Sequence, residues 1–237
     1  MTAGLLTLAS DAHDPAGLAT FWAHLLGRVL NDDGHGPLLP GSDTQVGLRF
    51  VQSRAEKVGP NSTHLHLTST SLTSQQETVA TALRLGADHL DVGQRPEEGH
   101  VVLADPEGNE FCVIEPGNAF LSGCGFLAEL ACDGTREAGL FWAAALGWPL
   151  VWDENPETAI QSPRGGTKVA WVGPPVAPKR GISRQRFEVR VPTGDLADEV
   201  DRFMQLGATR YRGIPSGVPG RLEFTDPDGN DFSLIPA

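Results

Sequence analysis

An internal repeat is the feature of this sequence that most restricts its fold. Three landmarks recur in the second half of the chain in the same order and at nearly the same spacing: FWAHLLG (21–27) as FWAAALG (141–147), LGA (85–87) as LGA (206–208), and DPEGNEFCVI (105–114) as DPDGNDFSLI (226–235). Chance hardly preserves order and spacing together, so the chain consists of two copies of one domain. We place the copies at residues 1–117 and 123–237, joined where Pro, Gly, Asn and Ser cluster.

Each copy divides again into two β-α-β-β-β units. Helical spacing of apolar residues, ended by a glycine in most cases, predicts four helices: Pro15–Leu26, Ser74–Leu85, Glu137–Leu146 and Leu196–Leu206. Asp14 is expected to cap the first of them, with Pro15 at its first position. One helix for several strands predicts an α+β fold and not a doubly wound parallel sheet.

Short apolar runs between these helices predict the strands. In the first copy they are Leu5–Ala9, Arg28–Asn31, Leu38–Leu39, Val46–Gln52, His64–Thr68, His89–Val92, His100–Ala104 and Glu110–Glu115. In the second copy they are Phe126–Ala131, Pro149–Trp152, Lys168–Val172, Arg186–Val191, Thr209–Tyr211, Arg221–Thr225 and Asp231–Ile235.

Composition and charge argue against several classes of function. The 237 residues carry 30 Asp+Glu against 18 Lys+Arg, a formal net charge of −12, which argues against nucleic acid as a partner. No apolar run approaches the roughly 20 residues that cross a bilayer, and the N-terminal segment lacks the basic start of a secretory signal. Three cysteines without CxxC spacing indicate reduced thiols. We therefore expect a cytoplasmic protein without a membrane partner.

The motifs together resemble the vicinal oxygen chelate superfamily, which includes glyoxalase I, extradiol dioxygenases and bleomycin-type resistance proteins. Three features carry the resemblance: the Phe-Trp-x-x-x-Leu-Gly helix end, the strand start at His64–Leu67, and the repeated Asp-Pro-(Glu/Asp)-Gly-Asn-x-Phe turn. In that turn Pro fixes φ and Gly accepts a positive φ, so the chain turns tightly into a terminal strand. The resemblance implies two tandem glyoxalase-like domains, each with paired β-α-β-β-β units that curl into a half-open mixed β-sheet cup with helices outside.

The resemblance also implies a divalent metal in the cup, held by His and carboxylate side chains on the first and last strand of each unit. In the first copy, strand alternation directs His64 and His66 into the cup, and His64 falls on a ligand position of the family. The metal-binding Glu of the family is here Cys112, and the first unit offers only Arg49 or Phe50.

The second copy has no histidine, so it is poorer still in metal ligands. Arg186 stands where His64 stands in the first copy, and Ser233 stands at the Glu position. A guanidinium cannot bind a metal. Glu129, Glu188 and Trp171 are expected to line the same cup. The prediction is no bound metal, with His64 and Cys112 as the weak metal candidates and one divalent ion as the alternative.

Several cup residues carry more than one interpretation. His64, His66 and Cys112 suit a soft metal site, a Cys–His nucleophile pair without an evident orienting acid, or a polar lining for an organic ligand. Glu129 and Glu188 suit either a general base or an ion-pair network, and the network is favoured. Its expected partners are Arg186 and Arg190.

The tryptophans divide in the same way. Trp152 and Trp171 have no counterpart at the equivalent first-copy positions and are candidates for stacking on a flat ligand. Trp22 and Trp142 occupy matching repeat positions and are expected in the core.

Two classes of function follow. The favoured one is a small-molecule binding protein that holds an organic ligand in the cup without a catalytic metal, as bleomycin-type resistance proteins sequester theirs. The alternative is a metal-dependent glyoxalase-type lyase or isomerase, or a dioxygenase, acting on a small oxygenated substrate. One copy that only packs against the other is a third interpretation. A monomer with intramolecular domain pairing is preferred over a homodimer.

Overall fold

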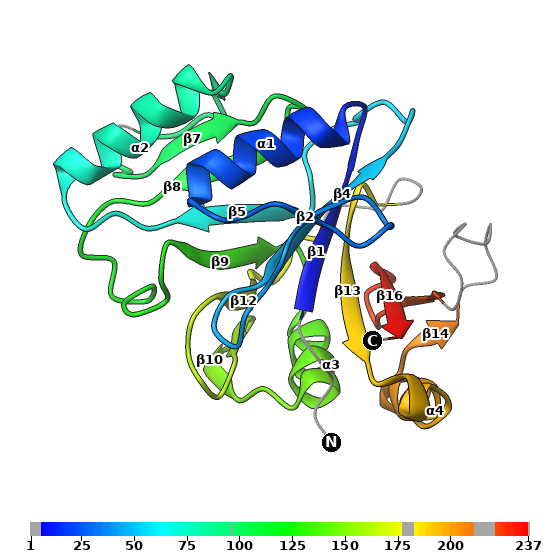
Figure 1. The fold of residues 1–237 in the computed structure, drawn as a ribbon. Helices are drawn as coiled ribbons and strands as arrows, with labels where there is room; N and C mark the ends of the chain where they lie inside the picture. The colour runs from blue at the N-terminus through cyan, green and yellow to red at the C-terminus, as the bar shows by residue number, and fades with distance from the viewer. Residues whose placement is uncertain (1–5, 96, 177–182, 211–220, 237) are drawn as a thin grey trace.

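The computed structural model describes residues 6–95, 97–176, 183–210 and 221–236 (Figure 1). Its elements follow the predicted order, β-α-β-β-β, four times. The predicted strand ends at Leu5 and Tyr211 lie outside the described residues. None of the helices described has the length and apolar character needed to span a bilayer.

The two units of the first copy have these bounds: β1 Leu6–Ala12, α1 Pro15–Leu26, β2 Asn31–Asp32, β3 Pro37–Leu39 and β4 Gly47–Gln52, then β5 Thr63–Leu67, α2 Leu72–Arg84, β6 Asp88–His89, β7 Val101–Ala104 and β8 Glu110–Val113. The third unit comprises β9 Leu127–Cys132, α3 Arg136–Leu146, β10 Leu150–Glu154, β11 Glu157–Gln161 and β12 Lys168–Trp171. The fourth comprises β13 Gln185–Val191, the short 3-10 helix Thr193–Asp195, α4 Leu196–Leu206, β14 Thr209–Arg210, β15 Leu222–Thr225 and β16 Asp231–Pro236.

The predicted signals at the ends of α1 are present. The Asp14 side chain accepts a hydrogen bond from the backbone N–H of Gly17, and Pro15 is the first helical residue. Gly27 ends the helix in the left-handed region at φ +63°, where a glycine has no steric cost. The strand β11 was not predicted from the sequence, because it begins directly after Pro156 and contains only two apolar residues, Ala159 and Ile160.

The strands form two eight-stranded mixed sheets. Sheet A has the order β14-β15-β16-β13-β1-β4-β3-β2, and sheet B has the order β10-β11-β12-β9-β5-β8-β7-β6. Each sheet therefore joins two units through a central antiparallel pair, β1 with β13 in sheet A and β5 with β9 in sheet B. The α+β class and the two open sheets are confirmed.

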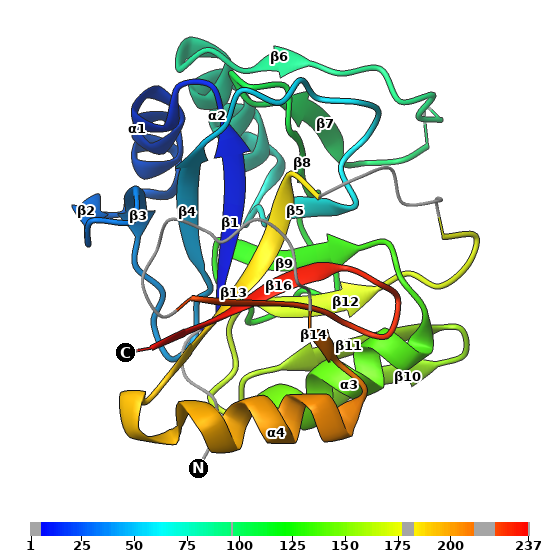
Figure 2. The same cartoon turned by 90° about the vertical axis from the view of Figure 1, so that its right-hand side faces the viewer.

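The units that share a sheet come from different copies, which corrects the expectation that each copy pairs its own two units. Sheet A combines the first unit with the fourth, and sheet B combines the second with the third. The helices keep to their own copy, since α1 lies beside α2 at one end of the molecule and α3 beside α4 at the other (Figure 2). Each copy is thus held together by its helices and core, and the copies are joined by their sheets.

The repeated motifs meet in the core of each copy. Trp22 Nε1 donates to Asp105 Oδ2 and Trp142 Nε1 donates to Asp226 Oδ2, each at 3.1 Å. The other oxygen of Asp105 accepts the backbone N–H groups of Glu107 and Asn109 inside the turn. The helix-end tryptophan and the turn aspartate therefore depend on each other, which explains why both recur, and the prediction that the two tryptophans are core residues is confirmed.

We expect Trp22→Phe to lower the free energy of unfolding by about 2 kcal/mol, because the buried Asp105 carboxylate loses a donor. Trp142→Phe should have a similar effect through Asp226. The control is Trp152→Phe, the same change at a side chain that is 37% exposed, with an expected effect within about 0.5 kcal/mol. Urea unfolding measures all three, and equal effects at positions 22 and 152 would contradict the role of the Trp–Asp bond.

Candidate ligand-binding cups

The face of sheet A opposite the helices, which we call cup A, is filled by paired charges. Arg49 lies at its centre, with Nε 2.8 Å from Glu188 Oε2 and Nη1 2.6 Å from Asp33 Oδ1. The other carboxylate oxygen of Glu188 accepts a hydrogen bond from Arg221 at 2.7 Å, and Arg221 also pairs with Glu223 at 2.6 Å. Arg49 and Glu188 are each only 2% exposed, so this is a buried ion-pair chain.

The chain of charges changes the proton affinities of its members. The hydrogen bond from Arg49 lowers the pKa of Asp33 to about 2, although partial burial opposes the change. The pKa of Arg49 is raised above its ordinary value, because the hydrogen bonds and charges of Asp33 and Glu188 outweigh its desolvation. Both groups are therefore charged at neutral pH.

Three of the residues predicted to line cup A lie on its surface, and a fourth, Phe50, does not. Arg186, Glu188 and Ser233 lie on the predicted face, since their strand neighbours Phe187 and Phe232 pack in the core. Phe50 does not line the cup: it packs beneath α1, and its neighbour Arg49 takes the cup position.

The predicted ion-pair network exists with different partners. Arg186 pairs with Asp11 and Arg190 with Asp33, whereas Glu188 is held by Arg49 and Arg221. Arg49 became a partner of Glu188 only because the sheet joins the two copies, which the sequence alone did not reveal, whereas Arg221 belongs to the same unit as Glu188.

The corresponding face of sheet B, cup B, carries a row of polar side chains across four strands. Strand register places Cys112 of β8 opposite His66 of β5, His66 opposite Glu129 of β9, and Glu129 opposite Lys168 of β12. His66 Nδ1 lies 2.7 Å from Glu129 Oε2. The prediction that Glu129 and Glu188 share a cup is therefore wrong. Glu129 lies instead beside a histidine of the other copy. Lys168 was not predicted as a site residue. Strand alternation could have placed it, because Val169 and Trp171 face the core and Lys168 and Ala170 therefore face the cup.

The environment of His66 raises its pKa to about 10. Burial alone would lower this pKa, but hydrogen bonds with Cys112 and Glu129 and the charge of Glu129 outweigh the desolvation. Because the pKa of the folded state lies above that of the unfolded chain, the stabilisation from His66 is complete below about pH 6.5 and is lost as pH rises towards 10.

The segment between the copies, residues 117–125, covers part of cup B; we call it the linker segment. Leu121 and Cys124 pack against Cys112 in one apolar cluster. The Lys168 ammonium lies 4.0 Å from the ring centroid of Phe120, and Trp152 of β10 meets the same ring edge-on at 5.7 Å. Gln161 donates to Cys124 Sγ at 3.5 Å. A stretch predicted only to connect the copies is thus part of the site.

The remaining predicted residues of this sheet lie apart from the polar row. His64 Nε2 lies 2.9 Å from the backbone oxygen of Asn61, so His66, and not His64, is the partner of Cys112. Trp171 is 1% exposed and lies on the helix side of β12, where it packs against Gly134 and Gly139; it does not line a cup. Trp152 is at the edge of cup B, where stacking on a ligand stays a prediction.

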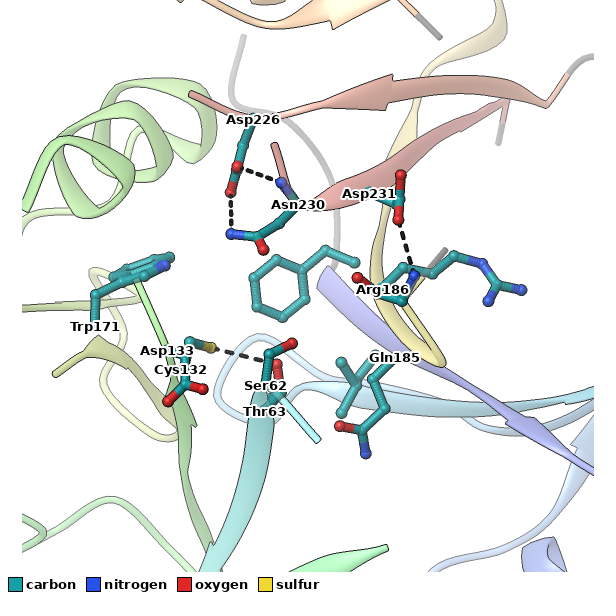
Figure 3. A pocket seen from close by; sticks show the side chains of 13 residues that line it. Ser62, Thr63, Cys132, Asp133, Trp171, Gln185, Arg186, Asp226, Asn230 and Asp231 are labelled. Atoms are coloured by element: carbon teal, nitrogen blue, oxygen red, sulfur yellow. Dashed lines mark hydrogen bonds between the residues drawn. The ribbon is translucent and has the colours of Figure 1, made fainter. Parts of the chain in front are cut away.

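A small pocket outside both cups lies where the two sheets approach each other. Figure 3 shows Trp171, Gln185, Asp226 and Asn230 around it, together with residues from the ends of β5 and β9. The Oε1 atom of the buried Gln185 has no hydrogen-bond partner among the described residues. This pocket contains none of the predicted ligand positions except Trp171 and Arg186.

The donor sets of the two cups do not fit the metal that the resemblance implies. In cup A, every carboxylate of the ion-pair chain is occupied by arginine, and Ser233 donates to Glu223 at 2.7 Å. In cup B, His66 and Glu129 bind each other and the next position is an ammonium, which cannot ligate. Within the described ranges, no three His, Cys, Asp or Glu side chains are grouped as a metal ion would require.

We expect Arg49→Met to lower the free energy of unfolding by about 3–5 kcal/mol, because Glu188 and Asp33 lose a buried partner. Arg164→Met is the matched control, since Arg164 pairs with Asp43 on the surface, where both side chains are more than half exposed. Its expected effect is within about 0.5 kcal/mol. Equal losses in chemical denaturation would contradict the importance of the buried chain.

His66 should remain an imidazolium at pH 8, and Glu129→Gln should move its titration to lower pH. The ring ¹³C and ¹H shifts measured by NMR across pH 5–11 report this directly. The control is Glu154→Gln, the same change at an exposed carboxylate of β10, which should leave the His66 titration in place. A His66 midpoint below pH 7 in the intact chain would contradict the assigned pairing.

Comparison with known proteins agrees with this architecture. A family model described as a glyoxalase-like domain matches residues 7–114 and again 128–235. Glyoxalase I from Zea mays superposes with a TM-score of 0.63 at 14% identity, covering 98% of this chain and 92% of that one. A Bacillus subtilis protein with a provisional assignment as a dioxygenase superposes with a TM-score of 0.61 at 13% identity, covering 98% of this chain and 84% of that one.

No curated protein sequence matches the chain. At these identities the structural likeness shows the fold alone, whereas the double family match covers most of the residues. The chain therefore belongs to the glyoxalase-like domain family of the vicinal oxygen chelate superfamily, with two domains in tandem.

Proposed function

We propose that this protein binds a small organic molecule in cup B without a catalytic metal. The observation that carries the proposal is the contrast between the two cups. Cup A is crossed by a buried chain of ion pairs, whereas cup B combines a polar row with a floor of small side chains. Ligand sites that take organic molecules are mostly apolar, with a few polar groups that fix orientation.

The floor of cup B consists of alanines on three adjacent strands. Ala159 lies opposite Ala170, Ala170 opposite Ala131, and Ala131 opposite His64. Their methyl side chains are smaller than the arginine side chains of cup A and carry no charge. The exposed edge of Trp152 beside Phe120 supplies an aromatic wall for a flat ligand.

Related properties belong to the same proposal. The two copies already supply the pairing that single-domain relatives obtain by dimerising, which supports a monomer over a homodimer. The acidic balance supports a small-molecule partner over nucleic acid, and we infer a cytoplasmic location from the reduced thiols. The alternative, a metal-dependent lyase or dioxygenase, draws support from the fold of relatives and not from the donor sets of this chain.

The proposal predicts that the purified protein contains less than about 0.1 divalent metal ion per chain by elemental analysis, and that aromatic library compounds raise its midpoint of thermal unfolding. Ala131→Phe, on the half-buried floor of cup B, should abolish those shifts. Ala80→Phe, the same change on the exposed face of α2, should leave them unchanged. One metal ion per chain, or ligand shifts that survive Ala131→Phe, would contradict the proposal.

A further inference from the structure

The polar row of cup B contains a thiol, an imidazole and a carboxylate in direct succession. We propose that Cys112, His66 and Glu129 form a nucleophilic triad, in which the Cys112 thiolate adds covalently to a small activated alkene, a carbon–carbon double bond conjugated to a carbonyl group. The inference goes beyond reversible binding, which requires no bond to sulfur.

The sheet brings the three groups together from both copies. Cys112 and Glu129 lie directly opposite His66 on the two strands that flank it, so all three side chains project from the same face. Directly opposed residues on neighbouring strands have Cβ atoms about 5 Å apart, within reach of a shared proton. The sequence showed the Cys–His pair but not the acid, because Glu129 belongs to the other copy.

Each group has a partner suited to its role. Glu129 holds Nδ1 of His66 at 2.7 Å, which fixes the ring and stabilises the imidazolium. Cys112 lies directly opposite the same imidazole on the neighbouring strand β8. A protonated imidazole beside a cysteine favours the thiolate, the nucleophilic form of the residue. His66 is further faced by His64 on its own strand and, beyond Glu129, by Lys168, whose charge suits a ligand with a carbonyl or carboxylate oxygen.

The addition balances without an oxidant or reductant. Sulfur forms a bond to the β-carbon of the alkene, the π electrons move towards the α-carbon, and the His66 imidazolium gives its proton to that carbon. The product is a thioether on Cys112 beside a neutral imidazole, which regains a proton from solvent.

The other two cysteines are internal controls, because their surroundings oppose ionisation. The Cys132 thiol faces the core and donates to the backbone oxygen of Leu130. Burial raises the pKa of Cys132 and also that of Cys124, which sits in the linker segment. A difference in reactivity among the three thiols therefore reports the triad and not general exposure.

The test uses N-ethylmaleimide on the native full-length chain, with the rate at each cysteine followed by peptide mass spectrometry. At pH 7 we expect Cys112 to react at least about 10-fold faster than Cys124 and Cys132. His66→Asn and Glu129→Gln should each slow Cys112 about 10-fold or more at pH 7. The matched control is His89→Asn, the same change at an exposed histidine on β6 of the same sheet, which should leave the rate at Cys112 unchanged.

Because Cys112 is only 8% exposed, Leu121→Ala supplies a second measurement by uncovering the thiol. It should accelerate labelling of Cys112 and not of Cys132. Labelling of all three cysteines together would identify an unfolded variant. The triad is refuted if Cys112 reacts no faster than Cys132 in both the wild-type and Leu121→Ala proteins, or if His66→Asn leaves its rate unchanged. Ligand-induced thermal shifts in Cys112→Ala test reversible binding separately.

Discussion

Antiparallel pairing of β5 with β9, and of β1 with β13, determines what each cup contains. Without these two pairs, Glu129 would have no histidine beside it and Glu188 would have no Arg49. Both contacts join residues far apart in the sequence, 63 positions for His66 and Glu129 and 139 for Arg49 and Glu188. The tandem arrangement is therefore part of each site and not a duplication of two independent ones.

The two cups have diverged in different directions from one architecture. In cup A, arginines occupy positions that face carboxylates, and the buried charges satisfy one another. In cup B, the polar row contains fewer charged side chains, the floor consists of alanines, and the linker segment lies over one side. A buried ion-pair chain loses much when one partner is removed, which favours its retention as structure.

Much of the fold could be predicted from local patterns. Alternation in His64–Leu67 and around Phe187 assigned the cup and core faces correctly, and the FW and DP-(E/D)-GN motifs marked the helix end and turn that meet in the Trp–Asp bond. The pairing of units across copies could not be predicted, because identical unit patterns allow either pairing with the same alternation. The wrong partners of Glu188 and Glu129 follow from this point, and the wrong faces of Phe50 and Trp171 follow from a one-residue choice on a strand. The cover over Cys112 was missed because a segment rich in turn residues gives no sign of what it packs against.

The most direct measurement is a double-mutant cycle on His66 and Glu129, which tests both the pairing of the copies and the assembly of cup B. The free energies of unfolding of the wild type, His66→Asn, Glu129→Gln and the double variant are compared at pH 7. Our account predicts a favourable coupling energy of about 1–3 kcal/mol, because each residue stabilises the other across the β5–β9 pair. Additive effects, with a coupling within about 0.3 kcal/mol of zero, would show that the two residues do not meet and would contradict the account.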